Sequence, residues 1–132
     1  MSDESALLQA ARAVREHAHA PYSRFRVGAA LLDEQGRVHA GCNVENAAYP
    51  QGLCAEAGAL AQLVAAGGRR VTAVVVVGDG AQPCTPCGGC RQKLREFAQD
   101  DLKIHCCTAD GTLIRTFTLG ELLPFSFGPE NL

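Results

Sequence analysis

A run of mostly β-branched residues, Ala73-Val74-Val75-Val76-Val77, lies just past the middle of the chain. Side chains of a strand alternate between its two faces, so a strand formed here would be apolar on both. Such a strand is stable where helices cover both faces, and the run therefore predicts a central strand with a helix layer on each side. The apolar stretch from Val71 to Val77 is also far shorter than the roughly 20 residues that span a bilayer.

Hydrophobic periodicity and turn residues place other elements around this strand. The predicted helices span residues 5–20, 54–66 and 90–99, with a short helical piece over 119–123. The other predicted strands span residues 25–31, 38–44, 102–108 and 112–118. We therefore predict an α/β fold, a three-layer α/β/α sandwich with a mixed five-stranded sheet, as a single domain over residues 1–132.

The charge balance argues against large polyanionic partners. Twelve lysines and arginines oppose fourteen aspartates and glutamates, which gives a formal net charge of −2 at pH 7. A protein that binds nucleic-acid phosphates normally carries a basic patch, so nucleic acid is not an expected partner. The acidic start, Met1-Ser2-Asp3-Glu4, lacks the cationic head of a signal peptide. We expect a cytoplasmic protein without a membrane partner.

Seven cysteines need an explanation in this chain. Their number is odd and the chain is long enough to bury a core without covalent links, so a disulfide framework explains them poorly. The informative pattern is Cys54-Ala55-Glu56 at one predicted helix start and Pro86-Cys87-Gly88-Gly89-Cys90 at the next. If each helix follows its own strand across the sheet, the two helix starts converge on one side of it. Three thiols could then meet there.

The position of these cysteines suits a metal. Helix N-termini lower thiol pKa values, because backbone N–H groups and the helix dipole favour negative charge there. Three thiolates, from Cys54, Cys87 and Cys90, leave a fourth position of tetrahedral zinc for water, as catalytic zinc sites do. Glu56 follows one of these ligands closely and could move protons to and from that water. The sequence predicts one catalytic Zn²⁺ per subunit, in the pattern that zinc deaminases share.

The cysteine pattern leaves alternatives open. The spacing Cys84-x-x-Cys87-x-x-Cys90 also resembles the start of an iron–sulfur run, although the fourth cysteine and its proline are absent. A non-catalytic zinc or iron–sulfur module is therefore the alternative outside the enzymes, and Glu56 beside a ligand argues against it. Cys106 could supply a fourth thiolate, but its position within a predicted strand favours a buried apolar role. The same interpretation applies to Cys42 and Cys107.

Longer segments resemble a known family. The segments NVENAAYPQGLCAE (43–56) and PCGGCRQ (86–92) are similar to the small, homotetrameric type of cytidine deaminase. PYSRFRVGAAL (21–31) resembles that family's first strand, and LLPFSFGP (122–129) resembles its C-terminal segment. The resemblance covers nearly the whole chain. It implies zinc-dependent hydrolysis of cytidine and 2′-deoxycytidine to uridine and 2′-deoxyuridine, with release of ammonia.

The resemblance also implies a role for individual residues. It places Cys54, Cys87 and Cys90 on zinc and makes Glu56 the proton shuttle. Asn43 and Glu45 would bind the ribose 3′-hydroxyl, and side chains separated by one residue of a strand do point the same way. The other implied substrate contacts are the ring of Phe25, the backbone of Ala55, Ala47 and Tyr49 of one subunit, and Phe127 of another. The implied assembly is a homotetramer whose sites are shared between subunits.

One position departs from the family pattern. The family commonly has arginine directly after the glutamate, where this chain has Ala57. Since three thiolates leave a zinc site with net negative charge, we predict that Arg91 supplies part of the compensating positive charge. Another aminopyrimidine nucleoside is the alternative substrate, and Asn43, Glu45 and Phe25 argue for an ordinary nucleoside. Editing of polynucleotides is disfavoured by the acidic balance.

Overall fold

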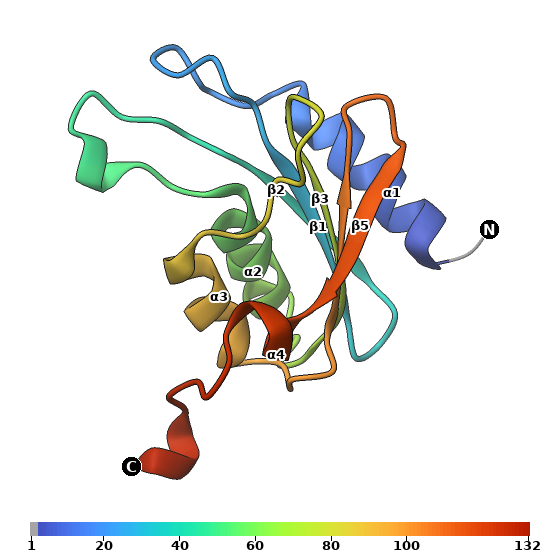
Figure 1. Ribbon diagram of the computed structural model, residues 1–132, viewed down its shortest axis with the longest axis vertical. Helices are drawn as coiled ribbons and strands as arrows, with labels where there is room; N and C mark the ends of the chain where they lie inside the picture. The colour runs from blue at the N-terminus through green and yellow to red at the C-terminus, as the bar shows by residue number, and fades with distance from the viewer. Residues whose placement is uncertain (1–2) are drawn as a thin grey trace.

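The valine run forms the middle strand of a mixed sheet (Figure 1), in a computed structural model that describes residues 3–132. The strands are β1 (Gly28–Asp33), β2 (Val38–Cys42), β3 (Val71–Val77), β4 (Lys103–Cys107) and β5 (Leu113–Thr118). Their order in the sheet is β2-β1-β3-β4-β5. β3 and β4 run parallel, and all other neighbours are antiparallel. The predicted central strand and the mixed five-stranded sheet are confirmed.

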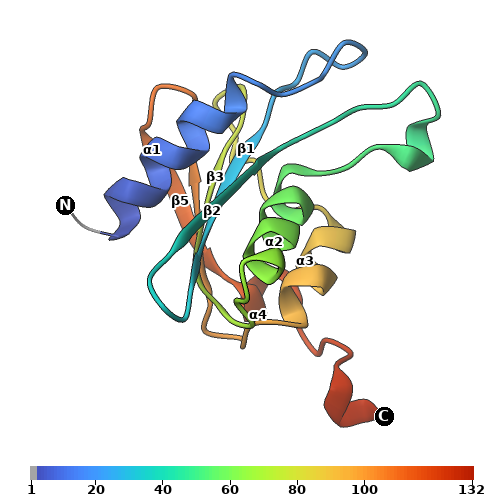
Figure 2. The same ribbon diagram turned by 180° about the vertical axis from the view of Figure 1, so that it is seen from behind.

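Helices cover both faces of the sheet (Figures 1 and 2). The helices are α1 (Asp3–Arg15), α2 (Ala55–Ala65), α3 (Gly88–Arg95) and α4 (Leu119–Leu122), with 3-10 turns at Tyr49–Gln51 and Pro129–Asn131. α1 lies on one face, and α2 and α3 lie side by side on the other. This arrangement confirms the predicted three layers. Across residues 3–132, no helix combines the length and the apolar character that crossing a membrane requires.

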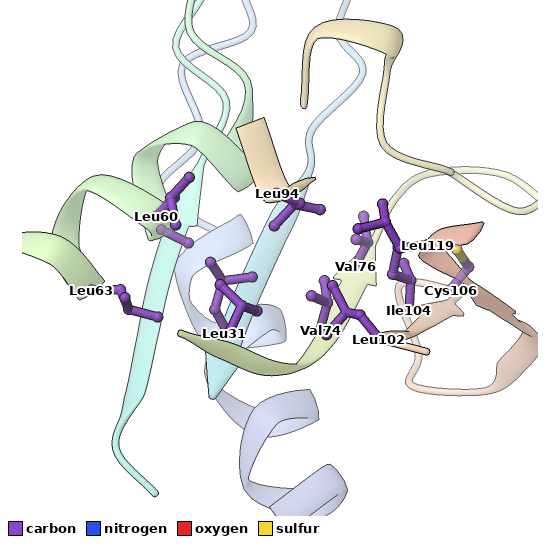
Figure 3. Packing of buried hydrophobic residues seen from close by; sticks show 12 residues of the cluster. Leu31, Leu60, Leu63, Val74, Val76, Leu94, Leu102, Ile104, Cys106 and Leu119 are labelled. Carbon is purple, nitrogen blue, oxygen red and sulfur yellow. The ribbon is translucent and has the colours of Figure 1, made fainter. Parts of the chain in front are cut away.

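The side chains of β3 enter two separate cores, because successive residues of a strand point to opposite faces. Val74 and Val76 pack in a cluster that includes residues of α2 and α3 (Figure 3). Val75 and Val77 pack in a second cluster with Leu7 of α1. Each fully buried side chain of this size stabilises the fold by about 1.5–3 kcal/mol. The two clusters also contain Cys106 and Cys107, respectively, which confirms that both cysteines are buried core residues.

The first helix is shorter than its apolar pattern predicts. α1 ends at Arg15, whereas the sequence predicts a helix over 5–20. The backbone N–H of His19 instead donates to the carbonyl of Asn43, and the N–H of Glu45 donates to the carbonyl of His19. These bonds pair the segment after α1 with the chain after β2, and backbone groups so engaged cannot also continue a helix.

Two further predicted boundaries are wrong, those of β1 and α3. β1 begins at Gly28, because the N–H of Val27 donates to an asparagine side chain rather than to a neighbouring strand. α3 spans Gly88–Arg95 rather than 90–99, with Cys87 as its N-cap. The first shift leaves Phe25 outside the strand, and the second places Cys90 in the first turn of α3 rather than at its first residue.

Two glycines let helices approach the sheet closely. A Cβ at Gly41 of β2 would lie 2.4 Å from the backbone nitrogen of Ala59 and 2.6 Å from the carbonyl oxygen of Ala55, both in α2. A Cβ at Gly28 of β1 would lie 2.1 Å from the carbonyl oxygen of Ala11 in α1. No side chain fits at either distance. The absence of a Cβ at these two positions therefore sets how near α1 and α2 lie to the sheet.

Candidate metal centre and active site

Three cysteine sulfurs come together where α2 and α3 begin. Cys54 is the N-cap of α2, Cys87 is the N-cap of α3, and Cys90 lies in the first turn of α3. Their Sγ atoms all lie within 4.8 Å of one another, and those of Cys54 and Cys87 are 3.6 Å apart. The two helices lie on the same face of the sheet (Figures 1 and 2), which brings distant segments together. The predicted meeting of the three thiols is confirmed.

This set of donors fits a tetrahedral zinc ion. Sulfurs bound at about 2.3 Å to such an ion lie about 3.8 Å apart, close to the 3.6 Å between Cys54 and Cys87. Within residues 3–132, no other group of three or more His, Cys, Asp or Glu side chains is close enough together to share a metal ion. Cys84 and Cys106, which a four-cysteine cluster would recruit, lie outside this group. The geometry favours the three-ligand alternative.

The three thiols respond differently to their surroundings. Burial raises the pKa of Cys54, and burial with the nearby Glu56 raises the pKa of Cys90 well above its ordinary value. Burial also opposes ionisation of Cys87, but hydrogen bonds from neighbouring groups, first the backbone N–H of Cys90, lower its pKa. The lowering predicted for helix starts therefore holds for Cys87 alone. A divalent cation bound among the sulfurs would favour ionisation of all three.

A buried carboxyl group lies next to the sulfurs. Glu56 is in the first turn of α2 and is only 5% exposed. Burial raises the pKa of its carboxyl group. Its charge acts through space on the thiols of Cys54, Cys84 and Cys90. A carboxyl group with a raised pKa suits proton transfer near neutral pH, because general acid–base catalysis is most efficient when the pKa approaches the working pH.

Asn43 joins the segment before β1 to the segment after β2. Its Nδ2 donates to the carbonyl of Phe25 at 2.8 Å, and its Oδ1 accepts from the N–H of Val27 at 2.9 Å. The backbone N–H of Asn43 also donates to the carbonyl of Val27, at 3.2 Å. A side-chain amide has a second donor hydrogen and a second lone pair. Asn43 can therefore hold this segment and still bind a hydroxyl group of a ligand.

Glu45 holds the residues just before this segment. Its Oε1 accepts hydrogen bonds from the N–H groups of Tyr22 and Ser23 at 2.9 and 3.1 Å, and its Oε2 accepts one from the Ser23 hydroxyl. These bonds, with that of the Ser23 hydroxyl first, hold the pKa of Glu45 below its ordinary value. The carboxylate is therefore ionised and keeps at least one lone pair for a further hydroxyl donor.

A pocket of about 530 Å³ lies beside these residues and the metal centre. Its lining includes Asn43, Glu45, Tyr49 and Cys54. The rings of Tyr22 and Tyr49 also line it and meet edge to face, with centroids 6.2 Å apart. Pockets for small molecules commonly have volumes of about 300–1,000 Å³. The pocket is large enough for a small ligand that contacts Asn43 and Glu45 at one end and the sulfur of Cys54 at the other.

Comparison with known proteins identifies the family. Residues 1–106 match the family model described as the cytidine and deoxycytidylate deaminase zinc-binding region. This chain belongs to the cytidine and deoxycytidylate deaminase family. It is therefore a zinc-dependent deaminase, and the matched region contains all three clustered cysteines and Glu56. The predicted family, the hydrolase class and the zinc cofactor are confirmed.

Relatives of this deaminase match it over nearly its whole length. A cytidine deaminase of Halalkalibacterium halodurans is 43% identical over 130 residues, which cover 98% of each chain. One of Sporosarcina psychrophila is 41% identical over 130 residues, covering 98% of this chain and 95% of the relative. The crystal structure of cytidine deaminase from Burkholderia pseudomallei superposes with a TM-score of 0.88 at 45% identity, covering 96% of this chain and 100% of the other.

The other predicted substrate contacts of the deaminase are spread more widely. Ala47 and Tyr49 are exposed on the loop between β2 and α2, and Ala55 is buried at the first position of α2. Phe25 is 40% exposed, and its ring lies beside Gly78. The C-terminal segment projects from the body of the molecule (Figure 1), and within it the carbonyl of Phe127 accepts a hydrogen bond from Nε2 of Gln92 in α3 at 2.9 Å. The pocket lining thus gathers Asn43, Glu45 and Tyr49 but not Phe25, Ala47, Ala55 or Phe127 of the same chain.

Arg91 contacts backbone and hydroxyl oxygens rather than thiols. Its Nε donates to the carbonyl of Pro86 and its Nη1 to the carbonyl of Leu122, both at 2.7 Å. Its Nη2 donates to the hydroxyl of Thr85 at 3.1 Å. Arg91 therefore joins the loop before Cys87 to the end of α4. Compensation of the thiolate charge by Arg91 stays a prediction.

Sequence reasoning missed two residues that shape the deaminase pocket. Tyr22 and Ser23 belong to the stretch that resembles the family's first strand, but no role was predicted for either. Ser23 donates to Glu45 and also accepts from the N–H of Phe25 at 3.0 Å. The available signal was the serine two residues before Phe25, because serine hydroxyls commonly bond to backbone groups nearby in the sequence.

Proposed function

We propose that this chain, as a single catalytic domain, hydrolyses cytidine and 2′-deoxycytidine to uridine and 2′-deoxyuridine and releases ammonia. One observation carries the proposal: three sulfurs and the buried Glu56 meet at two helix starts, beside a pocket lined by Asn43, Glu45 and Cys54. The relatives named cytidine deaminase match nearly the whole chain, which supports the choice of substrate.

In this proposal the zinc ligands are Cys54, Cys87 and Cys90. A zinc ion bound there supplies a Lewis acid that makes water more acidic. Glu56 accepts one proton from the attacking water and gives it to N3 of the cytosine ring. It then takes the second proton of that water from the new C4 hydroxyl group and delivers it to the 4-amino group, which leaves as ammonia when the C4–N bond breaks. Water and cytidine are thereby converted to uridine and ammonia without a redox step. The burial of Glu56 supports this role, because it keeps bulk water from the transferred proton.

The polar residues of the pocket would hold the sugar. Asn43 and Glu45 bind the ribose 3′-hydroxyl, using the hydrogen-bonding capacity that the segment before β1 leaves free. Phe25 flanks the nucleoside, and backbone groups of Ala55 contact the pyrimidine. Because cytidine and 2′-deoxycytidine both carry the 3′-hydroxyl, both are expected as substrates.

We further propose that the active protein is a homotetramer with shared sites. Ala47 and Tyr49 of one subunit and Phe127 of another would complete the pocket of a neighbour. Tyr22, Val44, Tyr49 and Leu53 are all exposed and line the same pocket, which supports this arrangement, because a contiguous exposed apolar patch commonly marks an interaction site. Phe127 is 57% exposed and therefore accessible to another subunit. Light scattering during gel filtration measures the assembly. A protein that is monomeric and fully active would contradict the proposal.

We also propose a cytoplasmic location. All seven cysteines are free thiols, and the candidate metal ligands bind zinc only while they are reduced. A reducing compartment keeps them in that state. Fractionation of cells that express the chain would test the location.

The reaction is tested by the ultraviolet change on deamination. Cytidine, 2′-deoxycytidine and free cytosine are each incubated with zinc-loaded protein and with protein treated with a chelator. We expect both nucleosides to be converted by the zinc-loaded protein alone, and free cytosine to react poorly because it lacks the sugar. Glu56→Gln is the matched control, since it keeps the shape of the side chain and removes its acid–base function. Equal turnover by this variant would contradict the role of Glu56.

A further inference from the structure

A buried arginine forms an ion pair with a partly exposed aspartate (34% exposed) near the face of the sheet opposite the three sulfurs. Arg15 is the last residue of α1, and its side chain is only 7% exposed. It pairs with Asp79, which lies in the loop after β3. A buried guanidinium is tolerated only where its charge and its donors are satisfied. The proposed chemistry uses neither residue, so the role of this pair must lie elsewhere.

The pair binds both backbone groups of Arg26. The Nε of Arg15 donates to the Arg26 carbonyl at 3.1 Å, and Oδ2 of Asp79 accepts from the Arg26 N–H at 3.0 Å. The guanidinium and the carboxylate are also bonded to each other. The three groups form a closed ring of hydrogen bonds in which the arginine or the aspartate is always the charged partner. Charge-assisted hydrogen bonds are stronger than neutral ones, so the ring fixes this peptide segment firmly.

The residues on either side of Arg26 are fixed by the active-site asparagine. Asn43 bonds to the carbonyl of Phe25 and to the N–H of Val27. Of these four consecutive backbone groups, Asn43 holds the outer two and the Arg15–Asp79 pair holds the inner two. Either set of bonds alone would leave the segment free to pivot, and together they define its position.

We propose that the Arg15–Asp79 pair is a positioning element for nucleoside binding. By fixing the backbone of Arg26, the pair sets where the ring of Phe25 lies beside Gly78 and where the side-chain amide of Asn43 lies in the pocket. This inference rests on the proposed function, which places these two residues on the nucleoside. Since the pair bonds to none of the metal ligands and not to Glu56, it acts on binding of the nucleoside rather than on the proton transfers.

Asp79→Asn tests the inference with little change in shape. The variant removes the charge and can turn an NH₂ group toward the guanidinium of Arg15, which breaks the ring of bonds. We expect KM for cytidine and Kd for the product uridine to rise about tenfold, with kcat changed less than about threefold. The backbone N–H signals of Phe25 and Val27 in NMR spectra should shift. Arg15→Lys keeps the charge but loses the forked geometry, and we expect an intermediate rise in KM.

Asp33→Asn is the matched control. Asp33 ends β1 at the opposite end of the strand from the pocket, and its fully buried carboxylate accepts from Arg37 Nε at 2.7 Å and bonds to His39 at 2.9 Å. The same substitution thus breaks an arginine–aspartate pair in both variants. We expect Asp33→Asn to lower the thermal midpoint while KM, Kd and the Phe25 signal stay as in the wild type.

The outcomes separate the inference from the proposed function. A wild-type KM and unshifted Phe25 and Val27 signals in Asp79→Asn would overturn the inference, as would an equal rise of KM in Asp33→Asn. If Asp79→Asn does not fold, Arg15→Lys decides by the same measurements. A wild-type protein without deaminase activity would overturn the proposed function, and the N–H signals would still show whether the pair positions residues 25–27.

Discussion

Replacing Gly41 with alanine measures how closely β2 must lie against α2. The new Cβ would lie 2.4 Å from the backbone nitrogen of Ala59 and 2.6 Å from the carbonyl oxygen of Ala55. Carbon atoms in contact need about 3.5 Å, so the backbone of α2 would have to retreat by roughly 1 Å. Overpacking of this kind typically lowers the free energy of unfolding by about 1–3 kcal/mol. The clash involves only backbone atoms, and no side chain can rotate to relieve it.

The same retreat would separate the candidate metal ligands. α2 carries Cys54 and Glu56, whereas Cys87 and Cys90 belong to α3 and would not follow. Metal–ligand distances tolerate deviations of only about 0.2 Å, much less than the required shift. We therefore expect the zinc affinity of Gly41→Ala to fall about 10- to 100-fold. Deaminase kcat/KM at limiting zinc should fall with it.

Two assays separate the loss of zinc from the loss of stability. Competition with a chromophoric chelator measures the Kd for zinc, and thermal unfolding in excess chelator measures the stability of the chain itself. Gly88→Ala is the matched control, because Gly88 lies between Cys87 and Cys90 but an added Cβ there would meet nothing within 4 Å. This variant should keep the wild-type zinc affinity and thermal midpoint.

A Gly41→Ala protein with wild-type zinc affinity and thermal midpoint would refute the argument. It would mean that α2 does not rest on the backbone of β2 as closely as described. An equal loss of zinc in Gly88→Ala would refute it differently, by showing that any added side chain near the cysteines disturbs the site.

Three other predictions follow from the site and the core. Glu56→Gln should lower kcat by about 10²- to 10⁴-fold while metal analysis finds unchanged zinc. Cys90→Ala should abolish zinc binding, whereas Cys84→Ser should keep it, because Cys84 lies outside the sulfur cluster; the zinc content of the purified variants tests both. Burial opposes ionisation of Asp33, but hydrogen bonds, first that from His39, outweigh it and hold its pKa well below the usual range. The stability advantage of the wild type over Asp33→Asn should therefore be complete above the unfolded pKa of about 4 and shrink as the pH falls below it. Thermal midpoints measured against pH would contradict this if the advantage persisted unchanged in acid.

Much of the fold was predictable because its signals are local. The valine run is apolar on both faces, and the two cores that β3 joins follow from that alone. The end of α2 was equally readable, since Gly67 adopts a φ of +95°, the left-handed conformation that glycine favours. The first helix shows the limit of periodicity. Its apolar pattern continues to Ala18, but bonds between His19 and the chain after β2 end it at Arg15.

The candidate site likewise contains residues that local sequence signals predict and residues whose contacts they do not predict. The cysteines and Glu56 were predictable because each stands at a helix start that the sequence marks, and because the same few residue types serve zinc chemistry wherever it occurs. The structural role of Asn43, which holds the segment before β1 in addition to lining the pocket, was not predictable. Its bonds to Phe25 and Val27 join segments that are 16–18 residues apart, and no pattern in either segment announces them.

By itself, then, the sequence determined the central strand, the layers around it, the candidate metal ligands and the family. Only the tertiary structure decided that Arg15 and Asp79, which are 64 residues apart in the sequence, form an ion pair and hold the backbone of Arg26, next to Phe25. The reason is physical. Periodicity and capping depend on neighbours along the chain, whereas the partner of a buried charge depends on which segments the completed sheet brings together.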